Sequence, residues 1–221
     1  MANYSMKHGI DIVFCVESSI EMSRHIDRIK KDMHKWCERI IHELEWKYQE
    51  IGELRTKLIT FTNYDQNDRE AILLTDFFVL PKDYDEFETC VNSFVLRDKS
   101  DKTVDGLEAL AYAICSKWSN EWMKRRRIII VYANSPTHSI GYHKNAEHYP
   151  KGMPKSMKEI ASWWDELGWS KRLVLFTPYA PDWNIITQMW DNTIHFPSEA
   201  GEGINNEEIK ELLTFMISPD I

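Results

Sequence analysis

The chain has 221 residues, of which 43% are hydrophobic and 28% are charged, and its formal net charge is −8 at pH 7. This length favours one sizeable α/β domain over two small ones, so we expect residues 1–221 to form a single domain with an ordered core at about 9–217. The acidic balance argues against general nucleic-acid binding, which needs a positively charged face. The sequence has no run of about 18 apolar residues and no signal-peptide core before the first predicted strand, so we expect a cytoplasmic protein without membrane contact.

Six short apolar segments rich in β-branched residues predict strands at Asp11–Val16, Arg55–Phe61, Leu73–Leu80, Ile128–Tyr132, Leu173–Thr177 and Thr193–Phe196. Amphipathic periodicity between them predicts helices at Glu21–Ile51, Tyr84–Phe94, Gly106–Trp118, Ser156–Leu167, Trp183–Trp190 and Asn206–Ile217. This alternation favours a doubly wound, Rossmann-like and mostly parallel six-stranded sheet with helices on both faces. Leu73–Leu80 follows the preceding strand after a short polar loop, so we place it antiparallel at one edge.

The first helix is predicted to be unusually long, because its apolar stripe continues from position 22 to position 51. Gly52 is placed to end it, and at about 45 Å its second half would extend beyond the sheet. Asn205 with Glu208 predicts a capping box at the last helix. The segment Ala133–Pro154 is long and irregular, and connections of that length are often functional.

Two further features concern charge and redox state. The basic run Lys124–Arg127 directly precedes an apolar strand, so we interpret it as a solvated strand entrance rather than a phosphate-binding patch. Four cysteines lie far apart without a CxxC pair, which predicts reduced, buried thiols (Cys15, Cys37, Cys90 and Cys115).

Polar residues stand where predicted strands end, which is where open α/β sheets bind ligands. The first strand is followed by "ESSIE", the third helix is preceded by "TVDG", and the fourth strand is followed by "ANSPTH". This constellation resembles the von Willebrand factor type A (vWA) domain, whose metal-ion-dependent adhesion site uses Asp-x-Ser-x-Ser, then Thr or Asp, then a further Asp at these three places.

The resemblance is most specific to the bacterial cytoplasmic vWA proteins of the TerY-like group. It is carried, in order along the chain, by "IDIVFCVESSIEM", "DGLEALAYAI", "KRRRIIIVYANSPTHS", "YPKGMPKSMKEIASWWDE", "KRLVLFTPYAPDWNII" and "IHFPSEAGEG". Membership would imply a protein-recognition role beside a kinase, a phosphatase or a component of a stress-response or anti-phage defence system.

The metal ligands of that family are only partly present. Ser19 and Asp105 match the pattern, whereas Glu17 and Asn134 replace aspartates and Glu21 replaces the second serine. Mg²⁺ demands near-octahedral geometry, so a carboxylate longer by one methylene disturbs such a site. Three alternatives stay open: an adhesion-type Mg²⁺ or Mn²⁺ site, an altered and weaker cation site, or no metal.

Three histidines recur every five residues in the long loop, at His138, His143 and His148. Their spacing matches no tight zinc motif, so we favour exposed loop histidines that, with Ser18, are candidates for partner contact. The leading functional prediction is a non-enzymatic interaction or scaffold module that binds another protein and has no catalytic residues. The alternatives are a metal-dependent ligand-binding domain and a metal-dependent hydrolase, for which no nucleophile is visible.

Overall fold

The computed structural model describes residues 7–47, 50–64, 70–98 and 101–218. The strands are β1 (His8–Glu17), β2 (Ile51–Phe61), β3 (Ile72–Leu74), β4 (Phe78–Leu80), β5 (Lys124–Tyr132), β6 (Lys171–Phe176) and β7 (Thr193–His195). The α-helices are α1 (Ile26–Trp46), α2 (Tyr84–Ser93), α3 (Gly106–Ile114), α4 (Met157–Glu166), α5 (Pro181–Met189) and α6 (Asn206–Ile217).

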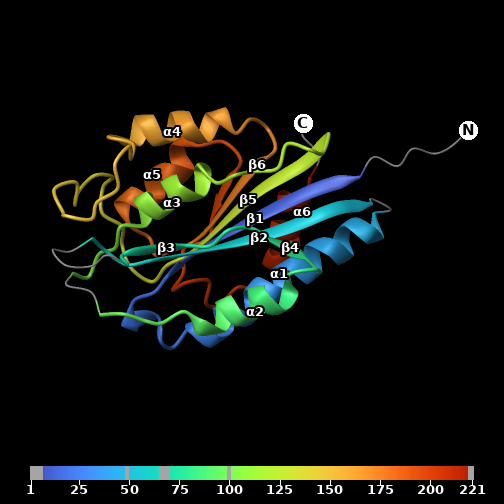
Figure 1. The fold of residues 1–221 in the computed structure, drawn as a ribbon, viewed down its shortest axis with the longest axis horizontal. Helices are drawn as coiled ribbons and strands as arrows, with labels where there is room; N and C mark the ends of the chain where they lie inside the picture. The colour runs from blue at the N-terminus through green and yellow to red at the C-terminus, as the bar shows by residue number, and fades with distance from the viewer. Residues whose placement is uncertain (1–6, 48–49, 65–69, 99–100, 219–221) are drawn as a thin grey trace, which may run out of the picture.

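The described strands form one mixed sheet in the order β3-β2-β1-β5-β6-β7, with β4 also paired to β2. All pairs among β2, β1, β5, β6 and β7 are parallel, and β3 and β4 run antiparallel to β2. Helices α3, α4 and α5 cover one face of the sheet, and α1, α2 and α6 cover the other (Figure 1). The predicted α/β class and mostly parallel sheet are therefore confirmed.

The central strand β1 is buried along its whole length, as the apolar run predicted. Its alternate side chains divide between the two cores: Ile12 and Phe14 pack with α1, whereas Val13 and Cys15 pack with α3. A strand covered on both faces needs no polar alternation, which explains the continuous apolar sequence.

The predicted edge strand Leu73–Leu80 is two short strands, so the described sheet has seven strands rather than six. The break lies at Thr75, whose hydroxyl accepts the main-chain N–H of Leu58 at 3.0 Å and donates to the carbonyl of Asp76 at 2.8 Å. A side chain has thus replaced one main-chain ladder bond, which interrupts the strand.

The first helix is shorter than predicted at both ends. A separate 3-10 turn occupies Ile20–Met22, and α1 begins only at Ile26 and ends at Trp46. Its buried side chains extend from Ile26 to Leu44, so the expected overhanging half is not found among the described residues. The capping box of α6 is confirmed, with Asn205 and Glu208 in both of its hydrogen bonds.

Gly52 does not end a helix but lies in β2. A Cβ atom at Gly52 would collide with the six-membered ring of Trp122, and a Cβ at Gly9 of β1 would collide with the same side chain. Glycine is required there because an indole covers both strands.

Two sequence interpretations need correction. Arg126 and Arg127 are buried rather than solvated, and the Arg127 guanidinium donates to the carbonyl of Leu167 at 2.9 Å and to Asn120 Oδ1 at 2.7 Å. The cysteines are all free thiols, but only two are buried, since Cys90 is half-buried and Cys115 is exposed.

Candidate functional site

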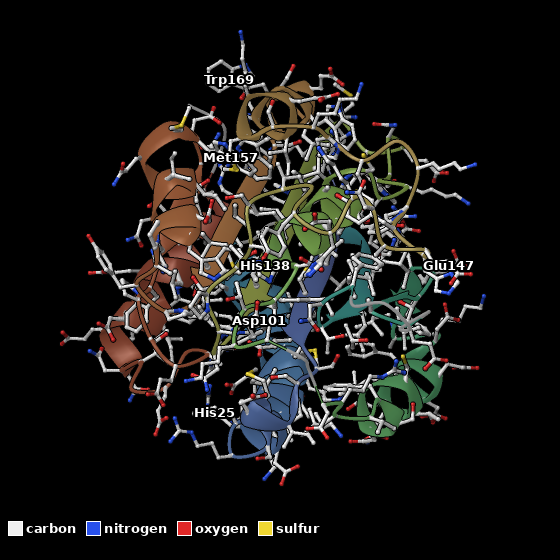
Figure 2. All side chains as sticks on the ribbon, turned by 90° about the vertical axis from the view of Figure 1, so that its left-hand side faces the viewer. His25, Asp101, His138, Glu147, Met157 and Trp169 are labelled. Atoms are coloured by element: carbon white, nitrogen blue, oxygen red, sulfur yellow. The ribbon has the colours of Figure 1, made fainter. Side chains whose placement is uncertain are left out.

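The candidate site lies at the carboxyl edge of the parallel strands, where the segments after β1, β2 and β5 meet. Figure 2 looks onto this edge, with Asp101 and His138 close together near its centre and His25 below them. The segment before α3 joins it through an isolated parallel bridge between Val104 and Thr137.

Glu17 is the last residue of β1 and is fully buried. Its Oε1 accepts the hydroxyls of Ser19 at 2.5 Å and Ser135 at 2.6 Å, and its Oε2 accepts the main-chain N–H groups of Asn134 at 2.8 Å and Ser135 at 3.0 Å. A buried carboxylate is stable without a counter-cation when several donors satisfy both of its oxygens. Glu17 therefore links the ends of β1 and β5 by hydrogen bonds.

The candidate partner-contact residue Ser18 and two further adhesion-site positions, Glu21 and Asn134, lie in different environments. Ser18 is buried, and its hydroxyl donates to the carbonyl of Phe61 at 3.3 Å, so it offers no open partner contact. Glu21 is exposed on the 3-10 turn, and Asn134 is half-buried. Glu17 and Glu21 do not group with Asp105 as ligands within the described residues.

These residues do not fit an adhesion-type Mg²⁺ site. Glu17 is held by protein donors, Asp105 is paired with His143, and Glu21 is exposed, so the three acids of the predicted ligand set lie in separate environments within the described residues. These carboxylates would have to be brought together before Mg²⁺ could complete an octahedral shell of oxygen ligands.

Asp105 is fully buried at the start of α3 and belongs to a different group. Its Oδ2 accepts the main-chain N–H of Tyr64 at 2.6 Å, and His143 Nδ1 lies 2.8 Å from Oδ2 and 3.0 Å from Oδ1. The long loop after β5 thus returns to place an imidazole on the carboxylate that precedes α3.

His138 is also buried, which contradicts the expectation of an exposed loop histidine. Its ring stacks on Tyr142 with centroids 4.1 Å apart and stands nearly perpendicular to the ring of His143 at 4.9 Å. The pKa of His138 is lowered, mainly because burial disfavours the charged imidazolium. The negative charge of Asp105 opposes this shift. His138, His143 and Asp105 each offer a ligand atom within 4.8 Å of the other two.

Glu108 is a second buried acid on α3 that faces the same loop. Its Oε1 accepts the main-chain N–H of Gly141 at 2.9 Å and the hydroxyl of Tyr149 at 2.8 Å, whereas its Oε2 has no hydrogen-bond partner among the described residues. Burial, together with the nearby charge of Asp105, raises the pKa of Glu108 to about 7. This carboxyl therefore holds its proton to a higher pH than an ordinary glutamate does.

His148 lies apart from the other two loop histidines and is not part of their ligand group. A second group of possible ligands in the described residues is formed by His25, Glu199 and Glu202. Arg24 already pairs with Glu199 and donates to His25 Nε2 at 2.9 Å, so a cation there would compete with a guanidinium.

A cavity of about 610 Å³ lies under the outer part of the loop. It is lined from Ile140 and Gly141 through Tyr149 to Lys155, and its charged lining residues are three exposed lysines, Lys144, Lys151 and Lys155. The loop therefore packs on two buried acids, Asp105 and Glu108, and the cavity lining carries three exposed lysines.

Sequence reasoning did not assign Ser135, Tyr64 or Glu108 to the site. Ser135 directly follows Asn134, but its contact with Glu17 spans 118 positions and leaves no local signal. The sequence does distinguish Glu108, because it is the single charged residue in the apolar helix "GLEALAYAI".

Comparison with known proteins supports the fold. No family model and no curated protein matches the sequence. The pilus adhesin SpaC from Lactobacillus rhamnosus GG superposes with a TM-score of 0.57 and 11% identity, over 96% of this chain and 32% of that chain. Proximal thread matrix protein 1 from the mussel byssus gives 0.54 and 7%, over 96% of this chain and 46% of that chain.

The chain spans less than half the length of either structure, and identities this low show a shared α/β fold alone. Within the described residues, no helix has both the length and the apolar character needed to cross a membrane.

Proposed function

We propose that the chain is a doubly wound, vWA-like protein-recognition module of the TerY-like group that works without catalysis and without an adhesion-type Mg²⁺. The observation that carries this proposal is the Glu17 carboxylate, which four hydrogen bonds hold in place of a cation. Ser19 and Ser135 are 0% and 3% exposed, so a substrate cannot reach either hydroxyl, which argues against their use as hydrolytic nucleophiles.

The partner surface is the carboxyl edge of the sheet. Three large apolar side chains are exposed in segments that follow β1, β5 and β6: Ile20 at 48%, Tyr142 at 63% and Tyr179 at 80%. Exposed aromatic residues grouped at one edge are typical of protein contact sites, where they add large contact area at low entropic cost. The partner class, a kinase, phosphatase or defence component in the cytoplasm, rests on the sequence resemblance.

Two measurements test the proposal. Thermal unfolding of metal-stripped protein should not change with about 5 mM Mg²⁺ or Ca²⁺, whereas a cation at about a hundred times its Kd would add about 2.7 kcal/mol and several degrees. Capture of a partner from the native host should be lost in the double variant Tyr142→Ala, Tyr179→Ala and kept in the control Trp46→Ala, Trp169→Ala, whose side chains are exposed outside this edge. Partner capture that requires added Mg²⁺ would overturn it.

A further inference from the structure

We propose that Asp105, His138 and His143 form a binding site for a zinc-class divalent cation, distinct in chemistry from the magnesium site that the sequence resemblance implies. Two imidazoles with one carboxylate are ligands that Zn²⁺ and Co²⁺ prefer, whereas Mg²⁺ prefers oxygen ligands alone. The site does not depend on the proposed recognition function.

The distances suit such a cation. Ligand atoms lie about 3.3 Å apart in a tetrahedral site whose bonds are about 2.0–2.1 Å long. His143 Nδ1 is 2.8 Å from Asp105 Oδ2, and the ligand atoms of all three residues lie within 4.8 Å of one another. Small side-chain rotations would therefore bring the three ligands to bonding distance.

His138 supplies an independent indication. Its side chain is 8% exposed, and its Nε2 has no hydrogen-bond partner among the described residues. Asp101 Oδ2 is 3.4 Å away, within ion-pair distance but long for a hydrogen bond. A buried ring nitrogen is costly to leave without a bond, and a cation held with Asp105 and His143 would satisfy it.

The surroundings hold the ligands in place. The main-chain N–H of Tyr64 fixes the Asp105 carboxylate, and the ring of Tyr142 fixes the plane of His138. The main chain of His138 is bonded to the carbonyl of Val104 at 2.8 Å, next to Asp105. Such outer contacts orient metal ligands and raise affinity. Asp101, whose side chain is 44% exposed, lies near enough to become a fourth ligand.

Calorimetric titration of Zn²⁺ and Co²⁺ into metal-stripped protein without a histidine tag tests the site. We expect one ion per chain, with affinity reduced at least about tenfold in His138→Asn and in His143→Asn. His148→Asn and His25→Asn are the matched controls and should bind as the parent does. Absence of stoichiometric binding, or binding that only His25→Asn removes, would overturn the proposal.

A second readout covers variants that fail to fold. Co²⁺ absorbs strongly in the visible range in four-coordinate nitrogen and oxygen sites and weakly when six-coordinate, so the parent protein should develop an intense band that saturates at one equivalent. A weak band at saturation contradicts the site. Mg²⁺ binding, by contrast, would contradict the proposed function and leave this test unchanged.

Discussion

Ser135 donates two hydrogen bonds to Glu17, one from its main-chain N–H at 3.0 Å and one from its hydroxyl at 2.6 Å. Glu17 ends β1, and Ser135 follows the end of the neighbouring parallel strand β5. The carboxylate therefore accepts hydrogen bonds from protein donors at the point where the sequence resemblance places a cation. Ser19 and Asn134 also donate to this carboxylate.

Glu17→Gln should destabilise the protein by about 2–4 kcal/mol. The new NH₂ group would face hydroxyl and N–H groups that now donate to a carboxylate oxygen, so those hydrogen bonds would be lost. Urea unfolding followed by circular dichroism measures this change. Glu21→Gln, an exposed acid four positions along, is the control and should change stability by less than about 0.5 kcal/mol. Equal stability of the two variants would mean that the hydrogen-bonded link contributes nothing.

The raised pKa of Glu108 predicts that the free energy of unfolding falls as pH rises from about 4.5 to 7. Its pKa is raised to about 7 in the folded protein, above the ordinary 4.5, so the folded state holds the proton more tightly. The stability it contributes is present below about pH 4.5 and is lost as pH rises towards 7, by about 3 kcal/mol in all.

Glu108→Gln removes this titration while keeping the shape of the side chain. The variant should therefore gain stability relative to the parent between pH 5 and pH 8, by up to about 3 kcal/mol. Urea unfolding at several pH values measures the difference, and Glu166→Gln on the exposed end of α4 should run parallel to the parent. A constant difference for Glu108→Gln would mean that the carboxyl titrates normally.

The sequence was informative where one local pattern has one physical cause. A continuous apolar run predicted the doubly covered strand β1, and Asn205 with Glu208 predicted the cap of α6. It was misleading at Gly52, because glycine ends helices and also lies in strands beneath aromatic rings. The site depends on contacts such as Glu17 with Ser135, 118 positions apart, and no local pattern encodes them.

Asp11 and Arg55 form a two-pronged pair across β1 and β2, with Nε and one terminal nitrogen each 2.7 Å from a carboxylate oxygen. Asp11 also accepts the main-chain N–H of Ser119 at 2.7 Å, and Arg55 also donates to the carbonyl of Lys117 at 3.2 Å, so each single substitution should cost more than the loss of the pair alone. The pair is largely buried, and a double-mutant cycle should give a coupling energy of about 1–3 kcal/mol. Additive losses in that cycle would show that the two side chains act separately.

Trp122 explains two glycines at once and gives a test of the packing at the start of the sheet. Gly52→Ala should destabilise the protein by about 1–3 kcal/mol, because the new Cβ overlaps the indole and forces it or the strand to move. Trp122→Ala will itself be destabilising, since it removes a large covering side chain. Adding Gly52→Ala to Trp122→Ala should lower the free energy of unfolding little further, because the indole that the new Cβ would overlap is absent. Urea unfolding of the parent, both single variants and the double variant measures the coupling; an undiminished cost of Gly52→Ala without the indole would show that β2 needs glycine for its backbone conformation instead.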